Sequence, residues 1–377
     1  MNIPLSKPEI TPEDVAAVSA VLKSGKLTQG PQTALFEEMA AAYVGAKFAI
    51  AVSSHATALH AALLAAGIAP GREVITSPFA FIAAANAIEQ CSARPRFVDI
   101  DPISLNLDPR KAISALSEES QALVVSHTFG LPAESAALCG EAETCGLVVI
   151  EEASQAWGAQ AGSVKVGGSP AALATVFSCY PGCPVTTGEG GLIVTHDAAF
   201  ADACRSLINL GRDPAAPKGG GKGASWLTHT RLGFNYRMDE MSAALGVSQL
   251  ARIDETLAQR QRLAEHYRGR LRPLKDRFIL PMEIAGCRRA WSTFNIICRE
   301  GVSREKVIGA LADKGIATER YFDPPLHLQP FYREKYGESP GTLNIAEGIA
   351  RQILALPFFT TMSAAEVDYV CDALEAL

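Results

Sequence analysis

Short apolar runs alternate with segments of helical periodicity through the first two-thirds of the chain. The runs predict strands at 48–52, 73–76, 96–98, 122–126, 147–150, 174–178 and 191–194. The segments of helical pattern predict helices at 12–24, 29–44, 58–66, 81–90 and about 133–145. Strands that are apolar almost throughout, with helices between them, form a largely parallel sheet covered on both faces. The pattern therefore predicts an α/β fold.

The last third of the chain has a different pattern. A long helix is predicted over 239–267, followed by a strand at 292–298 and helices at 303–314 and 364–377. This mixture predicts a smaller α+β domain, so the expected domains are 1–250 and 251–377. The segment Lys218–Gly223 is predicted to be a loop, and it is not a P-loop because the GxxxxGK[ST] spacing is absent.

The predicted sheet also indicates where a ligand would bind. In such sheets the site lies beyond the carboxyl ends of the strands. The loops that begin at Ser53, Ser77, Glu151 and Ser178 are therefore expected to form it.

Composition excludes several classes of protein. Hydrophobic residues make up 48% and charged residues 20% of the 377 residues, which excludes wholesale disorder. The net charge is −6 with no basic block, so nucleic acid is not an expected partner. No apolar run reaches the ~18 residues of a membrane span, and the first residues lack a secretion signal. Nine cysteines without a CxxC pair predict reduced thiols in a cytoplasmic protein and no metal site.

Six stretches carry a resemblance to a known family. They are LTQGP (27–31), VITSPFAFIAAANAI (74–88), EEASQAWGA (151–159), FSCYPGCPVTTGEGGLIVT (177–195), RLGFNYRMDEMSAALGVSQL (231–250) and PPLHLQPFYREKYG (324–337). In order and spacing the chain resembles the DegT/DnrJ/EryC1/StrS sugar aminotransferases. The resemblance implies the aspartate-aminotransferase-like fold type I of pyridoxal phosphate (PLP) enzymes, with a mostly parallel mixed sheet in an α/β/α large domain. It also implies a homodimer with shared active sites that transfers an amino group to a nucleotide-linked keto sugar.

The resemblance assigns roles to several residues. Phe81 matches the ring-stacking aromatic residue and Gln155 the glutamine near the ring oxygen, while Ser54 and Ser178 match phosphate ligands. The other matches are Asn235, which crosses from the neighbouring subunit, and Tyr321 and His327, which face the substrate. Each of these assignments has a structural alternative. Phe81 could pack in the core, Ser178 and Asn235 could be turn residues, and His327 could be a surface histidine.

The departures from the family pattern are more informative. Cys183 stands at the position of the lysine that forms the imine with the cofactor. A thiol cannot form that imine, so ordinary transamination is expected to be lost. Glu152 replaces an aspartate, and His55-Ala56 replaces the Gly-Thr of the phosphate turn. The last change puts a bulky ring where a backbone approaches phosphate, which weakens the case for bound PLP.

Three interpretations follow. The favoured one is a transferase or hydrolase without a cofactor, in which Cys183 is a nucleophile, His55 a base and Glu152 an orienting carboxylate, acting on an acyl donor or amide. The second is a nucleotide-sugar aminotransferase or dehydratase that binds PLP or pyridoxamine phosphate (PMP) non-covalently. The third is a non-catalytic partner subunit. Without a cofactor, the vacated volume could let Cys183, His55 and Glu152 converge. The carboxylate and the phosphate turn normally flank opposite ends of the cofactor, which counts against direct contact between Glu152 and His55, so the sequence leaves this contact open.

Overall fold

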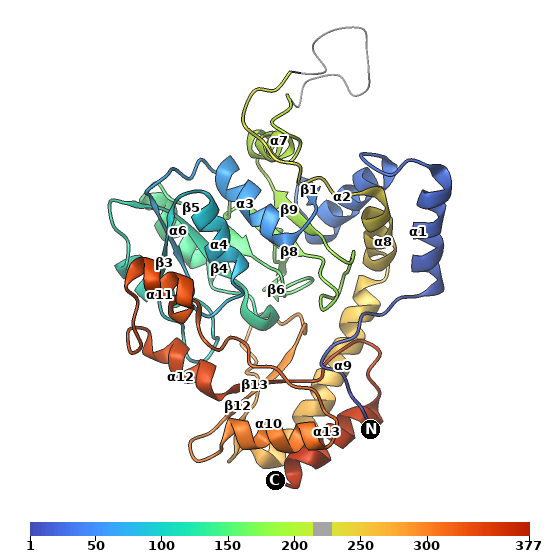
Figure 1. Cartoon of the computed structure of the whole chain (residues 1–377), viewed down its shortest axis with the longest axis vertical. Coiled ribbons are helices and arrows are strands. Elements are labelled where there is room, and N and C mark those ends of the chain that lie inside the picture. Colours follow the sequence, from blue (N-terminus) through green and yellow to red (C-terminus); the bar gives the residue numbers. More distant parts are fainter. Residues whose placement is uncertain (214–227) are drawn as a thin grey trace.

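A seven-stranded sheet forms the centre of the computed structural model, which describes residues 1–213 and 228–377 (Figure 1). Its strand order is β1-β9-β8-β5-β4-β2-β3. The strands are β1 (Phe48–Val52), β2 (Glu73–Thr76), β3 (Arg94–Phe97), β4 (Ser120–Ser126), β5 (Val148–Glu152), β8 (Ala174–Ser178) and β9 (Gly191–Thr195). Strand β9 runs antiparallel to both of its neighbours, whereas the pairs from β8 to β3 are parallel. The predicted mostly parallel mixed sheet is confirmed.

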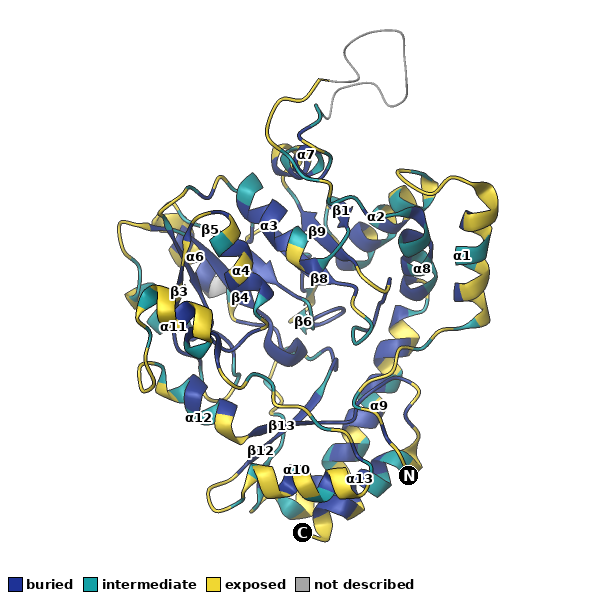
Figure 2. Ribbon diagram, viewed as in Figure 1, coloured by how far each residue is buried: buried dark blue, intermediate teal, exposed yellow. Residues whose placement is uncertain are grey.

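Helices cover both faces of this sheet because side chains alternate along each strand. In β4, Val124 packs on one face, whereas Leu123 and Val125 pack on the other. The first face is covered by α3 (His55–Ala65), α4 (Ala83–Gln90) and α7 (Ala198–Leu207). The second face is covered by α2 (Pro31–Val44), α5 (Pro109–Ser114), α6 (Ser135–Thr144) and α8 (Glu240–Leu250). Figure 2 shows the buried strands between these helices.

The C-terminal part has its own apolar cluster. Its helices are α9 (Ile253–Leu271), α10 (Arg304–Asp313), α11 (Pro330–Tyr336), α12 (Asn344–Gln352) and α13 (Ala364–Glu375). Helices α9 and α13 pack together in this cluster although they are far apart in sequence. A three-stranded sheet has the order β10 (Phe278–Ile279), β12 (Phe294–Cys298) and β13 (Ile353–Leu356). A second small sheet joins the two parts, in the order β11 (Cys287–Arg288), β6 (Gln160–Ala161) and β7 (Val164–Lys165). Helix α1 (Pro12–Ser24) precedes α2, and short 3₁₀ turns lie at Thr128–Gly130, Arg272–Leu274 and Leu326–Leu328.

One sequence prediction needs correction. The helix expected over 239–267 is two helices, α8 and α9, which are separated at Ala251 and Arg252. The apolar periodicity continues across this short break, so the pattern does not reveal it. Ile3 pairs with Ile316 and packs in the C-terminal cluster, whereas the domain bounds 1–250 and 251–377 stay a prediction. The predicted loop at 218–223 lies outside the described residues.

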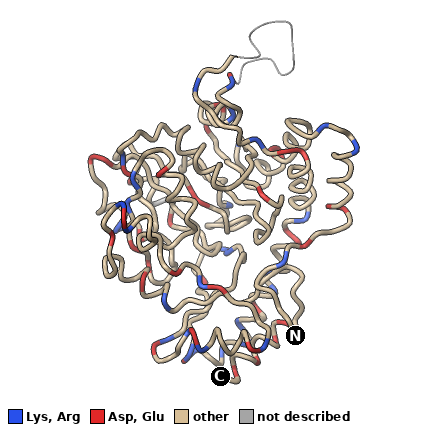
Figure 3. The backbone as a smooth tube through the Cα atoms, in the orientation of Figure 1, with Lys and Arg blue, Asp and Glu red and all other residues tan. Residues whose placement is uncertain are grey.

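Charged residues of both signs are distributed along the chain (Figure 3). Within residues 1–213 and 228–377, no helix is long and apolar enough to cross a membrane. In the same residues, no group of three or more His, Cys, Asp and Glu side chains is arranged to hold a metal ion.

Candidate functional site

A cavity of ≈ 680 Å³ lies at the carboxyl ends of the central strands, where the sequence predicts the site. The loops after β1, β2, β5 and β8 line it, and Tyr321, Ser292 and Phe358 close it from the C-terminal part. It brings together most of the predicted site residues: Ser54, His55, Phe81, Glu152, Gln155, Ser178, Cys183 and Tyr321. Asn235 and His327 do not line it.

The position of His55 follows from the start of α3. The Ser54 hydroxyl caps the helix by accepting the Thr57 backbone N–H at 3.2 Å, which makes His55 the first helical residue at the cavity edge. Its Nε2 atom lies 3.0 Å from Oε1 of Glu152, although the oxygen lies off the N–H direction. The sequence leaves the contact between these two residues open, and the structure brings them together. The long imidazole and the extra methylene of glutamate together span the gap between β1 and β5.

Glu152 is held in its ionised form. Burial raises the pKa of this carboxyl group, but His55 and Ser154 outweigh burial and bring the pKa to about 2. The Ser154 backbone N–H donates to Oε1 at 2.8 Å. At neutral pH the cavity therefore contains a buried carboxylate in contact with an imidazole.

Cys183 is not paired with a base. Its thiol donates to the Ser154 carbonyl oxygen at 3.3 Å, and within the described part of the chain it forms no hydrogen bond with His55. Burial raises the pKa of this thiol to about 11, against the opposing effects of the Ser178 hydroxyl and the Arg260 charge. A thiol in this state is protonated at neutral pH and is a poor nucleophile.

The residues matched to the cofactor ring and phosphate present groups to the cavity. Phe81 has 59% of its surface exposed, so its ring is not core packing. Gln155 is fixed because its Oε1 accepts the Phe129 backbone N–H at 2.8 Å. The Ser178 hydroxyl accepts the Tyr180 backbone N–H at 3.3 Å, which gives it a turn contact as well as a place in the cavity wall.

His327 and Asn235 lie elsewhere. His327 is fully buried, and its Nε2 lies 3.2 Å from Oε1 of Glu347, so it is neither a surface histidine nor a cavity residue. Asn235 is exposed and bridges to Asn209 outside the cavity of its own chain. Its role in a neighbouring subunit stays a prediction.

Sequence reasoning missed three hydroxyl groups in the cavity wall. Ser126, Thr128 and Ser292 line the cavity, are nearly fully buried, and have hydroxyl groups without a hydrogen-bond partner in the described residues. Ser126 ends β4, so the rule that selected Ser53 and Ser77 also applies to it. Ser292 follows no such pattern.

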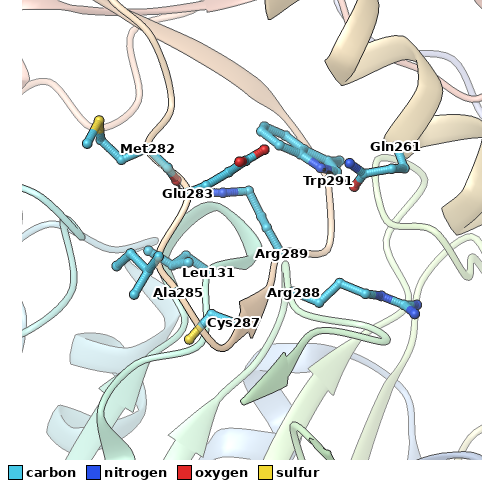
Figure 4. A pocket seen from close by; sticks show the side chains of 10 residues that line it. Leu131, Gln261, Met282, Glu283, Ala285, Cys287, Arg288, Arg289 and Trp291 are labelled. Atoms are coloured by element: carbon cyan, nitrogen blue, oxygen red, sulfur yellow. Dashed lines mark hydrogen bonds between the residues drawn. The ribbon is translucent and has the colours of Figure 1, made fainter. Parts of the chain in front are cut away.

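The charge of the cavity is negative. Glu152 and Glu189 line it, and none of its lining residues in the described ranges is lysine or arginine. A separate hollow of ≈ 390 Å³ has the opposite character, since Arg288 and Arg289 line it together with Trp291 (Figure 4). That hollow contains none of the predicted site residues.

These features test whether the PLP implied by the resemblance fits. Position 183 supplies no amine, and the carboxylate that would face the pyridine nitrogen is already engaged by His55. Among the residues that the structure describes, the cavity lining also offers no cationic side chain to a phosphate dianion. As arranged, the residues do not fit a covalently held PLP.

Comparisons with known proteins agree with the sequence resemblance. The model of the DegT/DnrJ/EryC1/StrS aminotransferase family matches residues 8–375. Spore coat polysaccharide biosynthesis protein SpsC of Bacillus subtilis is 35% identical over 377 residues, covering 99% of this chain and 96% of SpsC. The structure of S. venezuelae DesV in complex with a ketimine intermediate has 31% identity and a TM-score of 0.91, covering 100% of this chain and 98% of DesV. DesI, solved in the presence of its TDP-sugar product, has 26% identity and a TM-score of 0.88, covering 100% of this chain and 92% of DesI. These matches confirm the predicted fold.

Proposed function

Because the chain belongs to the DegT/DnrJ/EryC1/StrS aminotransferase family, we propose that it is an enzyme acting on a nucleotide-linked keto sugar, with His55 and Glu152 as its acid–base pair. The substrate class is the one suggested by relatives such as DesI, which was solved with a TDP-sugar product. The loss of the imine-forming amine at position 183 separates this chain from ordinary transamination.

The observation that carries the proposal is the 3.0 Å contact between Nε2 of His55 and Glu152 in the cavity wall. In the neutral tautomer that carries its proton on Nε2, next to the Glu152 carboxylate, the Nδ1 lone pair can act as a base. This is the arrangement in which a carboxylate orients an imidazole and stabilises its protonated form.

The corresponding reaction is proton transfer beside a carbonyl group. Nδ1 removes the proton from the carbon next to the sugar ketone, the C–H electron pair moves into the enolate, and Glu152 stabilises the imidazolium. Return of the proton to carbon gives an isomerised sugar. Delivery of the proton to a departing hydroxyl group gives water and a dehydrated sugar.

Cys183 has a positioning role in this proposal. Its thiol holds the Ser154 carbonyl, and the backbone N–H of Ser154 holds Glu152. The raised pKa of Cys183 suits a neutral hydrogen-bond donor and not a nucleophile.

A second candidate retains the family's cofactor. In this alternative the protein is a sugar aminotransferase or dehydratase that binds PLP or PMP non-covalently. The observation in its favour is that Phe81, Gln155 and Ser178, the residues matched to the cofactor ring and phosphate, line one cavity. It requires Glu152 to release His55 so that the carboxylate can face the cofactor.

One experiment separates these candidates. Cofactor-free protein is incubated in D₂O with nucleotide-linked 4-keto-6-deoxy sugars, and NMR follows deuterium entry beside the ketone. The proposal predicts exchange that H55A reduces by about 10²–10⁴-fold. Exchange that begins only after PLP or PMP is added would support the second candidate. No exchange in either condition would support a non-catalytic partner subunit.

We also propose that the protein is a cytoplasmic homodimer. The support is its nine free cysteines and the exposed segment around Asn235, which matches the family's interface segment. Sedimentation of the purified chain tests the dimer.

A further inference from the structure

Three unpaired hydroxyl groups face the cavity. The exposed fractions of Ser126, Thr128 and Ser292 are 2%, 3% and 6%, and none of their hydroxyl groups has a hydrogen-bond partner in the described residues. A buried hydroxyl group without a partner destabilises the folded protein, because it has lost its hydrogen bonds to water. Their presence in one cavity wall points to a ligand that completes them.

The hydroxyl groups of Ser126 and Thr128 belong to the same part of the cavity wall as Glu152 and His55, and we call this part the floor of the cavity. Ser126 and Glu152 are register partners in neighbouring parallel strands, so their side chains lie on the same face of the sheet. His127 points to the other face, where its Nε2 lies 3.5 Å from Oε1 of Glu151. Ser126 and Thr128, which flank His127, therefore point into the cavity.

Two further groups extend this floor. The Oε1 atom of Gln155 accepts the Phe129 backbone N–H at 2.8 Å, and its side-chain amide also lines the cavity. Phe81 presents an exposed aromatic ring to the same cavity. The floor thus combines hydroxyl groups, an amide donor and an apolar surface.

This chemistry matches a sugar ring and not a phosphate group. Hydroxyl groups both donate and accept, so serine, threonine and sugar hydroxyls pair with one another. A phosphate dianion would instead meet the carboxylates of Glu152 and Glu189 without a lysine or arginine among the described lining residues.

We propose that Ser126, Thr128 and Gln155 form a subsite for the hydroxyl groups of the substrate's sugar ring, with the nucleotide diphosphate outside the floor. The subsite lies beside His55 and Glu152, so it would hold the sugar carbon next to the base. This inference rests on the proposed function for its substrate class.

The test measures what the sugar ring adds to binding. Calorimetry compares UDP with UDP-glucose, dTDP with dTDP-glucose and GDP with GDP-mannose on wild-type protein and on S126A, T128V and the double variant. We expect at least one nucleotide sugar to bind more tightly than its nucleoside diphosphate. The double variant should reduce this ratio by about 10-fold or more and leave the affinity for the diphosphate unchanged.

The matched control is T76V. Thr76 ends the neighbouring strand β2, and its buried hydroxyl donates to the Val124 carbonyl at 3.1 Å outside the cavity wall. The melting temperature of T76V should fall, whereas those of S126A and T128V should stay equal or rise, because their hydroxyl groups have no partner in the ligand-free protein. T76V should keep the wild-type ratio between the affinity for the nucleotide sugar and the affinity for its nucleoside diphosphate.

Two results would overturn the proposed subsite. If the double variant keeps the wild-type ratio, the hydroxyl groups hold only water, and the subsite is wrong while the proposed function stands. If no nucleotide sugar binds wild-type protein better than its diphosphate, and deuterium exchange is also absent, the subsite and the proposed function both fail.

Discussion

Nε2 of His55 lies 3.0 Å from Oε1 of Glu152. His55 begins the helix that follows β1, and Glu152 ends β5, yet these two strands are separated in the sheet by β9 and β8. The helix cap at Ser54 fixes one side chain, and the end of β5 fixes the other. The pair therefore lies in the wall of the carboxyl-end cavity.

Shortening Glu152 should disrupt the pair. In E152D the carboxylate is one methylene further from the imidazole, so the variant should lose about 10–100-fold in deuterium exchange with a nucleotide-linked keto sugar. E152Q, which keeps the length but not the charge, should lose at least as much. Full exchange by E152D would show that contact with His55 is not needed.

Cys183 should tolerate replacement by serine. A serine hydroxyl can donate to the Ser154 carbonyl as the thiol does, so C183S should keep exchange within about threefold, whereas C183A should lose more. A loss of about 100-fold or more in C183S would instead support the nucleophile interpretation.

The Cys183 thiol should also be slow to alkylate. Its pKa is raised to about 11, so iodoacetamide labelling near pH 8 should be slow and should accelerate as the pH approaches 11. The exposed Cys145 is the internal reference in the same digest. Faster labelling of Cys183 than of Cys145 at pH 8 would contradict the raised pKa.

Acid should destabilise the fold through Glu151 and Glu152. Burial raises both pKa values, but His127 and His55 respectively outweigh burial and bring each pKa to about 2. A lowered carboxyl pKa stabilises the fold above its ordinary value of 4.5, and this contribution is lost as the pH falls toward 2. Urea unfolding of E152Q should therefore change less between pH 5 and pH 3 than that of wild-type protein. E38Q, at an exposed glutamate, should behave like wild type.

Restoring the lysine alone should not restore the cofactor. In C183K the His55 ring still engages Glu152, so added PLP should give no stable imine absorbance band. The variant C183K/H55G/A56T/E152D removes this obstacle and should acquire the band. A band in C183K alone would show that His55 does not occupy the cofactor space.

Much of the fold could be predicted because each strand is a short apolar run with clear ends. β1, β2 and β8 begin and end where the pattern places them, and the cavity lies at the predicted edge. The break at Ala251 escaped prediction because helical periodicity continues through it.

The site was less predictable because side-chain reach is not visible in spacing. The family motifs indicate that His55, Glu152 and Cys183 line one cavity. Only the structure shows that His55 contacts Glu152, whereas the Cys183 thiol donates a hydrogen bond to the Ser154 carbonyl oxygen. His327 was misplaced for the same reason, since its partner Glu347 lies twenty residues further along the chain.

The most direct test of the His55–Glu152 pair is ¹⁵N NMR of protein labelled in its histidine rings. The account predicts that both ring nitrogen resonances of His55 shift in E152Q, because the Glu152 carboxylate lies 3.0 Å from Nε2. The resonances of His60, whose Nδ1 lies 3.0 Å from the Tyr236 hydroxyl, should not move. Identical His55 resonances in wild-type protein and E152Q would contradict the account.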